Sequence, residues 1–262
     1  MIKLSNINFI REQRHILHDV NLHIREGENW VVLGRNGSGK TTILEMVNGY
    51  HFPSSGTVEV LGHRYGTVDL RELRRSIGYI SQSLFEKLNR ADPVWEVMAT
   101  GAYAYLRFYQ EIPEEARLKA LELLERVGLS HLKDQPLGTL SQGERKKVML
   151  ARSLMADPKV LIMDEPCSGL DLYERERMLK SVQELCGHGI TVLYVTHHIE
   201  EIMPLFTHVA LIEQGRIIAA GPKHEVLKPE LLLRVFDVPL ELEWFQGRPW
   251  AKVIQNGVEE HA

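Results

Sequence analysis

A glycine-rich stretch near the N-terminus carries the clearest chemistry in the sequence. Residues Gly34 to Thr41 fit the phosphate-loop pattern G-x-x-x-x-G-K-[ST]. Glycines let successive backbone N–H groups turn toward one anion, the start of the next helix adds partial positive charge, and Lys40 reaches the outer phosphates of a nucleotide. Thr41 is placed to hold Mg²⁺. The predicted cradle comprises Gly34, Asn36, Gly37, Ser38, Gly39, Lys40, Thr41 and Thr42.

Two adjacent carboxylates form the second candidate site. Asp164 and Glu165 directly follow the apolar run Val160 to Met163. We expect Asp164 to bind Mg²⁺ directly or through water, and Glu165 to polarise the water that attacks the γ-phosphate of a nucleotide. An acidic pair can instead start a helix, because carboxylates are favourable there. The coexistence of this pair with a phosphate loop favours catalysis.

A third stretch begins with Leu140 and continues Ser141, Gln142, Gly143 and Glu144. Ser141 and Glu144 have the spacing of a capping box, which alone indicates only a helix start. Gly143 in the first turn exposes backbone N–H groups, however, so this helix start is a second anion site. A single nucleotide does not need two such cradles.

Residues 1 to about 220 resemble an ATP-binding-cassette (ABC) ATPase. The stretch from Leu140 to Glu144 is similar to the signature LSGGQ of that family. Gln82 resembles its glutamine loop, residues 168–171 its D-loop, and His197 its switch histidine. These motifs occur in the order that the family shows.

The resemblance implies two cassettes that dimerise head to tail, with ATP and Mg²⁺ between them. Ser141, Gln142 and Gly143 of one cassette would contact the γ-phosphate that Lys40 of the other holds. Asp171 would couple the two sites. The remaining roles implied are those of His197, which would bond the γ-phosphate and orient Glu165, and of Gln82, which would sense phosphate and ligate magnesium.

Three departures from the family pattern bear on these assignments. Gln142 and Glu144 replace a glycine and a glutamine of the signature, and we expect both changes to be tolerated because Ser141 and Gly143 remain. Cys167 stands where threonine is frequent, and we assign it no redox role. Arg11 stands where the family has an aromatic residue that stacks on adenine; its guanidinium can also stack on a base, with Phe9 and His15 as alternatives.

The fold class implied by the resemblance is α/β, a P-loop NTPase (RecA-like) core with an antiparallel β subdomain and an inserted helical subdomain. Alternating apolar positions predict an antiparallel start, and the continuous apolar run at residues 30–33 predicts a buried strand before the phosphate loop and a helix over residues 41–48. Pro113 is placed to open a helix. After residue 140, helices near residues 143–155 and 173–185 alternate with strands at 160–163 and 191–196, which predicts a parallel sheet. The expected division has residues 1–83 with 137–221 as the nucleotide-binding core, 84–136 as the helical subdomain and 222–262 as a tail.

Composition limits the partners. Lys and Arg number 31 against 35 Asp and Glu, so the net charge of −4 offers no positive field for nucleic acid. We expect neither a secretory signal nor a membrane span, because no apolar run approaches about 20 residues. Two distant cysteines, Cys167 and Cys186, favour the cytoplasm, and the scattered histidines predict no metal–histidine site.

A lone cassette of this kind resembles the nucleotide-binding subunit of a transporter whose membrane subunits are separate chains, which would hold it at the inner face of the cell membrane. An apolar and aromatic set could dock those subunits or simply pack the helical subdomain. Its members are Leu84, Phe85, Trp95, Val97, Met98, Tyr103, Tyr105, Phe108 and Tyr109. The alternative function is a soluble single-cassette ATPase that acts on ribosomes or in cofactor assembly.

Overall fold

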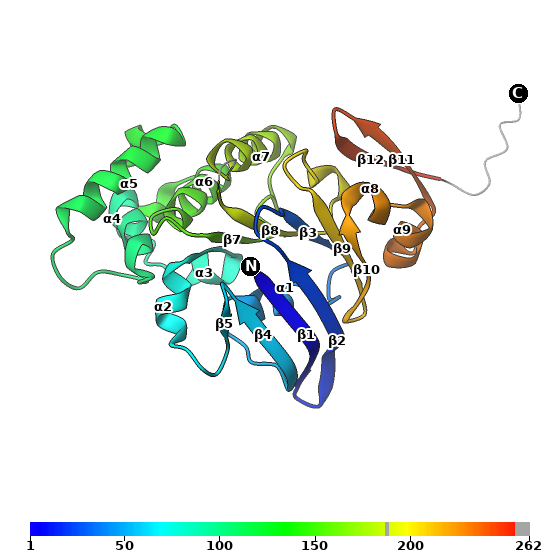
Figure 1. The fold of residues 1–262 in the computed structure, drawn as a ribbon. Coiled ribbons are helices and arrows are strands. Elements are labelled where there is room, and N and C mark those ends of the chain that lie inside the picture. The colour runs from blue at the N-terminus through cyan, green and yellow to red at the C-terminus, as the bar shows by residue number, and fades with distance from the viewer. Residues whose placement is uncertain (187–188, 255–262) are drawn as a thin grey trace, which may run out of the picture. The chain divides into compact units, whose positions relative to one another are not determined.

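The computed structural model describes residues 1–186 and 189–254 (Figure 1). These residues belong to two compact units. Unit 1 joins residues 1–65 to the chain from Tyr194 onward, and unit 2 comprises Gly66–Leu193. The strand β8 (Thr191–Thr196) contains the boundary between them. The last residues of the predicted tail, 255–262, lie outside the described residues.

Unit 1 begins with an antiparallel sheet of four strands in the order β2-β1-β4-β5. Its strands are β1 (Ile2–Arg11), β2 (Arg14–Ile24), β4 (Ser55–Val60) and β5 (His63–Arg64). In β1, the buried Ile2 and Leu4 alternate with exposed or half-buried residues, because successive side chains of a strand point to opposite faces. The predicted antiparallel start is confirmed: Ile2 pairs with Ile24 on one side and with Val60 on the other.

A second sheet of unit 1 holds the strand that leads into the phosphate loop. Its strands are β3 (Trp30–Leu33), β9 (His208–Glu213) and β10 (Arg216–Pro222). All four residues of β3 are buried, as the apolar run predicts. β9 runs parallel to β3 and antiparallel to β10. Helix α1 (Lys40–Val47) follows the loop, one residue earlier at each end than the sequence predicts.

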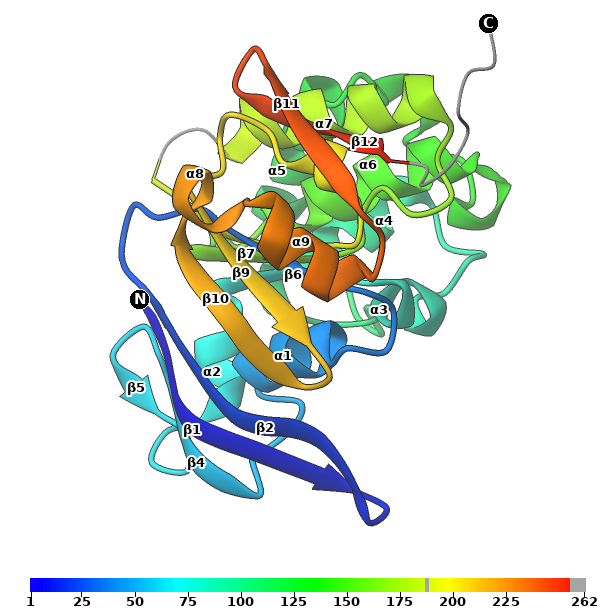
Figure 2. The same ribbon diagram turned by 90° about the vertical axis from the view of Figure 1, so that its right-hand side faces the viewer.

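The chain after β8 completes unit 1. Besides β9 and β10 it contains the 3₁₀ turn η4 (Ile199–Glu201). The segment predicted as a tail from residue 222 contains the helices α8 (Lys223–Val226) and α9 (Pro229–Phe236) and the strands β11 (Leu240–Phe245) and β12 (Arg248–Val253). β11 and β12 form an antiparallel hairpin of two strands. Figure 2 shows this hairpin beside α9.

Unit 2 contains two parallel strands, β6 (Ile77–Ile80) and β7 (Val160–Asp164), whose residues are buried up to Met163. The helices associated with its predicted chemistry are α3 (Gln82–Lys87), α6 (Gln142–Ser153) and α7 (Leu172–Cys186). Helix α2 (Leu70–Arg75) precedes β6. The predicted helices near residues 143–155 and 173–185 are therefore present, with ends displaced by one or two residues.

The remaining segment of unit 2 is less helical than the sequence predicts. It contains α4 (Val94–Ala99), η1 (Thr100–Tyr103), α5 (Glu114–Arg126), η2 (Ser130–Leu132) and η3 (Leu137–Thr139). Residues 104–113 are irregular, because Ala104 turns to φ +55° and ends η1. Pro113 lies at the start of α5 as expected. The division into core, helical subdomain and tail stays a prediction.

None of the helices in residues 1–186 and 189–254 is both long and apolar enough to cross a membrane.

Candidate nucleotide-binding site

The phosphate loop connects β3 to α1 in unit 1, and its backbone requires glycine. Gly39 is the N-cap of α1 with φ +103°, a left-handed conformation that L side chains rarely adopt. A Cβ at Gly39 would also lie only 2.8 Å from Cδ2 of Leu17. Glycine therefore lets the chain turn tightly into the start of α1, where the partial positive charge of the helix N-terminus favours an anion.

Lys40 places its charge inside the loop. The side chain is 4% exposed, and its Nζ donates to the carbonyl oxygens of Gly34 at 2.9 Å and Arg35 at 3.0 Å. Ser38 is also buried, and its Oγ has no hydrogen-bond partner among the described residues. A buried ammonium and an unused hydroxyl in one loop suit a polyanionic ligand, because both can donate to phosphate oxygens.

The turn between β9 and β10 supports the loop. Gly215 N donates to Ser38 O at 3.0 Å, and His18 N donates to Gly215 O at 2.9 Å. A pocket of about 420 Å³ opens beside the loop. Its lining residues are Arg35, Asn36, Gly37, Ser38, Ile212, Glu213, Gln214, Arg234, Val235 and Asp237. Arg234 of α9 pairs with Glu213 at 2.9 Å, so the C-terminal helix contributes to this wall.

The carboxylate pair lies at the end of β7 in unit 2. Asp164 is the last residue of the strand and Glu165 the first residue after it. Glu165 has φ +46°, a conformation that is uncommon for a residue with a long side chain. Such strain concentrates at functional sites, where surrounding structure holds it in place. Ser168 N donates to Glu165 O at 3.0 Å, and this hydrogen bond closes the turn that begins at Glu165.

Gln82 is the first residue of α3, and its amide is oriented by its own helix. Its Nε2 donates to Oε1 of Glu86 at 3.0 Å, four residues later. The amide oxygen is therefore the end that remains for a ligand. Gln82, Gln142 and Asp164 line the same small pocket of about 170 Å³, so unit 2 brings three of the predicted site residues together.

The helix start at Ser141 has the capping box that its sequence predicts. Glu144 N donates to Ser141 Oγ at 3.3 Å, and Ser141 N donates to Glu144 Oε2 at 2.7 Å. Hydrogen bonds from the side chain and from the backbone of Ser141 to the Glu144 carboxyl hold the pKa of that carboxyl below its usual value. These bonds fix the first turn of α6, which is the candidate second anion site.

Gly143 permits a close approach to the helix that follows the D-loop motif. A Cβ at Gly143 would lie 2.4 Å from Oε2 of Glu174, which belongs to the first turn of α7. The same carboxylate oxygen lies 3.8 Å from Nζ of the buried Lys147. Burial is the main cause that lowers the pKa of Lys147. A larger residue at position 143 would therefore have to displace the carboxylate end of the Glu174 side chain.

Gln142 joins the signature stretch to the D-loop motif in the same unit. Its Nε2 donates to Ser168 O at 3.2 Å. Asp171 accepts from Glu174 N at 2.9 Å through its Oδ1, so it caps the start of α7. The departure from glycine at position 142 thus adds a contact within the chain. The predicted coupling role of Asp171 stays a prediction.

His197 follows β8 in unit 1, in a short segment fixed from both sides. His198 N donates to Thr196 Oγ1 at 3.0 Å, and the rings of His197 and His198 lie 4.1 Å apart. Thr196 Oγ1 in turn donates to the buried Glu201 at 2.7 Å. The backbone that carries His197 is therefore closed into a small hydrogen-bonded loop.

Arg11 lies at the tip of the β1–β2 hairpin with a side chain that is 63% exposed. Its guanidinium approaches Glu12 at 3.9 Å, a weak contact. The two alternatives are already engaged: Phe9 stacks on His51 and His15 stacks on His18, with centroids 5.3 Å apart in each pair. Arg11 and His15 are both exposed, and Arg11 is the planar group that takes part in neither of these stacks.

The donors predicted for magnesium have suitable chemistry. The hydroxyl of Thr41, the amide oxygen of Gln82 and the carboxylate of Asp164 are hard oxygen ligands of the kind that Mg²⁺ prefers. Thr41 is exposed at the start of α1, and Asp164 is half-buried. Within the described residues there is no group of three or more His, Cys, Asp or Glu that could hold a metal ion. A ligand set of this mixed kind would be completed by phosphate oxygens.

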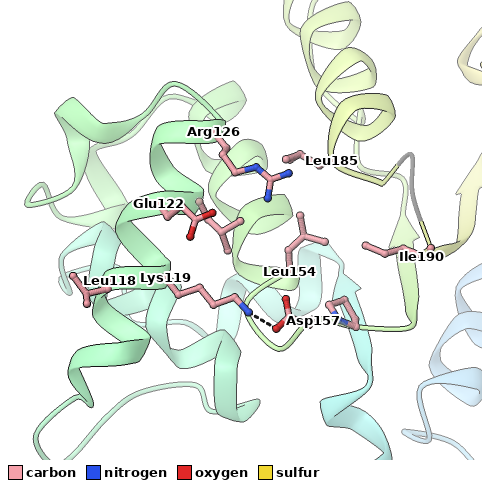
Figure 3. A pocket seen from close by; sticks show the side chains of 11 residues that line it. Leu118, Lys119, Glu122, Arg126, Leu154, Asp157, Leu185 and Ile190 are labelled. Carbon is pink, nitrogen blue, oxygen red and sulfur yellow. Dashed lines mark hydrogen bonds and ion pairs between the residues drawn. The ribbon is translucent and has the colours of Figure 1, made fainter.

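A further pocket of unit 2 involves none of the predicted site residues. It has a volume of about 590 Å³ between α5, the end of α6 and the end of α7. Figure 3 shows Lys119 of α5 paired with Asp157 at 2.5 Å and Arg126 of α5 extended toward Leu185. Its charges balance, since Glu122 and Asp157 oppose the two cations.

Several residues that support the site have little signal in the sequence. Glu86 could have been found from its helical spacing to Gln82. Glu174 and Glu201 act through contacts that only the folded chain creates, namely the packing against Gly143 and the hydrogen bond from Thr196.

Comparison with known proteins gives a consistent result. Residues 17–168 match a family model described as ABC transporter. An uncharacterized ABC transporter ATP-binding protein, YlmA of Bacillus subtilis, is 42% identical over 253 residues, which cover 95% of this chain and 96% of the relative. The energy-coupling factor transporter ATP-binding protein EcfA3 of Clostridium perfringens is 34% identical, with 92% and 84% covered.

Solved structures agree with this similarity. The cbiO1 protein of Clostridium perfringens, part of the ABC transporter complex cbiONQ, superposes with a TM-score of 0.75 at 33% identity, covering 89% of this chain and 92% of that one. A dimeric ATP-binding cassette bound to ADP and Pi in a post-hydrolysis state superposes with a TM-score of 0.74 at 27% identity, covering 85% and 98%. Both are cassettes with the P-loop NTPase fold and an antiparallel β subdomain.

Proposed function

Since this chain belongs to the ABC transporter family and is an ATP-hydrolysing subunit of such a transporter, we propose that two copies close head to tail around ATP and Mg²⁺ to drive separate membrane subunits. One observation supports this proposal: besides its phosphate loop the chain has a second helix start, at Ser141 to Gly143, whose first turn is fixed by a capping box. We propose that this second start takes its phosphate from the nucleotide of another copy.

In this proposal the phosphate loop binds and orients the nucleotide. Backbone N–H groups at the start of α1 donate to the phosphates, and Lys40 adds a charge that is already fixed in the loop. The first turn of α6 from the partner copy would donate to the γ-phosphate. A ligand bound by both copies favours the closed dimer by its differential affinity, and hydrolysis removes that preference.

The carboxylate at position 165 supplies the base. Glu165 accepts a proton from the water whose oxygen attacks the γ-phosphorus, while the bond to the leaving oxygen of ADP breaks. His197 donates to the γ-phosphate oxygens and orients Glu165, and Gln82 positions the water. Mg²⁺, when bound through Thr41, Gln82 and Asp164, neutralises charge on the phosphates. The turn at Glu165 fixes the backbone from which this carboxylate extends.

The membrane partner is proposed from the names of relatives and from an exposed aromatic cluster, whose members are Tyr103, Tyr105, Phe108 and Tyr109. The rings of Tyr103, Tyr105 and Phe108 contact one another, and Tyr109 is 92% exposed. EcfA3 and cbiO1 are named as parts of transporters. Docking on membrane subunits would hold this chain at the inner face of the cell membrane.

The test of the proposed function is Glu165→Gln. The amide cannot take the proton, so turnover should fall by about 10² or more while ATP binding is retained. Sedimentation with ATP and Mg²⁺ should then show a dimer, whereas the wild-type chain should return to monomer. Glu125→Gln, an exposed change on α5, is the matched control and should leave the turnover rate and the sedimentation behaviour of wild type unchanged. A variant that stays monomeric with ATP bound contradicts the head-to-tail dimer.

A further inference from the structure

The C-terminal hairpin β11–β12 lies against the segment that follows His197. The first residues of β12 contact η4, which begins two residues after His197. The Nη2 of Arg248 donates to Glu200 O at 2.6 Å, and the guanidinium also covers the ring of Trp250, with Cζ 5.2 Å from its centroid. Hydrogen bonds from charged donors are stronger than neutral ones, so this contact holds the backbone of η4.

A second cation fixes the other end of the same segment. Lys223, at the start of α8, is 7% exposed, and its Nζ donates to Gly247 O at 3.1 Å and to Met203 O at 3.4 Å. Burial lowers the pKa of its ammonium, and the ring of Trp244 lies 5.9 Å from Nζ. Lys223 therefore joins the hairpin turn to Met203, the second residue after η4.

The clamped segment is connected to His197 by side-chain hydrogen bonds. Glu201 is 1% exposed, and its Oε2 accepts from Tyr194 OH at 2.8 Å and from Thr196 Oγ1 at 2.7 Å. Thr196 also accepts from His198 N, and Nδ1 of His198 lies 3.5 Å from Oε1 of Glu200. A shift of η4 would thus move the residues on both sides of His197.

We propose that the hairpin β11–β12 positions the switch histidine, with Arg248 as the positioning residue that acts on His197 through the backbone of Glu200. The inference rests on the proposed function, because it needs His197 to act on the γ-phosphate. Arg248 touches neither nucleotide nor phosphate loop in this role. It should therefore alter the rate of the chemical step and not the binding of ATP.

Substitution of Arg248 provides the test in the full-length chain. Arg248→Ala should lower kcat about tenfold, since small displacements of a positioned group cost rate, with KM for ATP within about twofold of wild type. Arg248→Lys should have a kcat between those of Arg248→Ala and wild type. The lysine ammonium can still donate to Glu200 O, but it lacks the planar guanidinium that lies over the ring of Trp250. Lys252→Ala, which removes an exposed lysine of the same hairpin that pairs with the exposed Glu243, should have the kcat and KM of wild type.

Two measurements distinguish positioning from damage and from failure of the proposed function. The number of nucleotide sites per chain should stay unchanged in Arg248→Ala. A loss of sites in proportion to the loss of kcat would show damage to the fold and would overturn the positioning role of Arg248. A kcat within about twofold of wild type would overturn it as well. His197→Ala serves as the reference. If His197→Ala lowers kcat and Arg248→Ala does not, the hairpin inference alone is overturned, whereas an unaffected His197→Ala contradicts the proposed function itself.

Discussion

At the scale of single residues, Lys40 and Glu165 share a feature: each is held in its orientation by the chain before any ligand is considered. The Lys40 ammonium is bonded to two loop carbonyls, and Glu165 lies at a left-handed turn after a buried strand. Groups that are fixed in advance lose little freedom on binding or reaction. Their substitution should therefore change function more than fold.

Lys40→Ala should abolish ATP binding, lowering affinity by about 10² or more, because the charge-assisted bonds to the outer phosphates disappear. Titration with a fluorescent ATP analogue measures the change. Lys180→Ala, which removes an exposed lysine of α7 paired with Glu184, is the matched control and should bind as wild type does. Wild-type affinity in Lys40→Ala would exclude the loop from the site.

Arg11 tests how the base of the nucleotide is recognised. If its exposed guanidinium stacks on adenine, Arg11→Ala should weaken ATP binding severalfold and reduce the discrimination between ATP and GTP, because stacked groups contribute about 1–3 kcal/mol. Arg14→Ala is the natural control, since Arg14 is the cross-strand partner of Arg11 in the same hairpin. An unchanged ratio of the two dissociation constants would remove Arg11 from the site.

At the scale of elements, the strands that the sequence predicts best are those buried on both faces. β3 and β8 have continuous apolar runs, and each matches its prediction. The hairpin β11–β12 is not predicted from the sequence, although Leu240, Leu242 and Trp244 alternate with polar residues. One face of the hairpin is exposed, so its apolar pattern is weak, and it lies in the segment predicted as a tail. The alternation of apolar and polar residues within a hairpin does not indicate which other element the hairpin packs against.

The candidate site shows the same limit. The phosphate loop, the carboxylate pair and the capping box each occupy a few consecutive residues, so their spacing is visible in the sequence. The packing of Glu174 on Gly143 and the bond from Arg248 to Glu200 O join residues far apart in the chain. The apolar set of the helical segment was equally ambiguous: Phe85, Val97 and Met98 are buried, whereas Tyr109 is exposed.

The capping box of α6 gives the element its pH dependence. Because the bonds with Ser141 lower the pKa of Glu144 in the folded chain, the unfolded chain binds more protons and stability rises with pH. The contribution of Glu144 is complete above its ordinary value of 4.5 and is lost as pH falls through the lowered folded value. Glu144→Gln keeps an acceptor for Ser141 N and removes the titration.

Urea unfolding at about pH 6 and about pH 3 should therefore show a smaller loss of unfolding free energy in Glu144→Gln than in wild type. Ser141→Ala, which removes the N-cap oxygen, should cost about 1 kcal/mol at the higher pH. Glu122→Gln, on the exposed face of α5, is the control and should keep the wild-type difference. If the unfolding free energy of Glu144→Gln falls between the two pH values as much as that of wild type, Glu144 does not contribute to the pH dependence of stability.

At the scale of the whole molecule, the question is how a chain that hydrolyses ATP could transmit that event to another protein. The aromatic cluster of Tyr103, Tyr105, Phe108 and Tyr109 lies at the end of η1 and in the irregular segment that follows it in unit 2. Exposed aromatic residues are enriched at protein interfaces, and the cluster has no catalytic group. We expect it to contribute to docking and not to ATP hydrolysis.

Replacement of Tyr105 and Tyr109 by alanine should therefore leave the ATPase rate of the isolated chain unchanged but weaken its recovery with a multi-span membrane protein about tenfold, because buried aromatic anchors dominate interface energies. The measurement is co-purification from solubilised membranes with identification of the partner. Leu118→Ala removes another exposed apolar side chain, on α5, and should not change recovery. If the double variant recovers the partner as well as wild type does, the cluster is not the docking surface. If the wild-type chain recovers ribosomes and no membrane protein, the alternative function as a soluble ATPase is favoured.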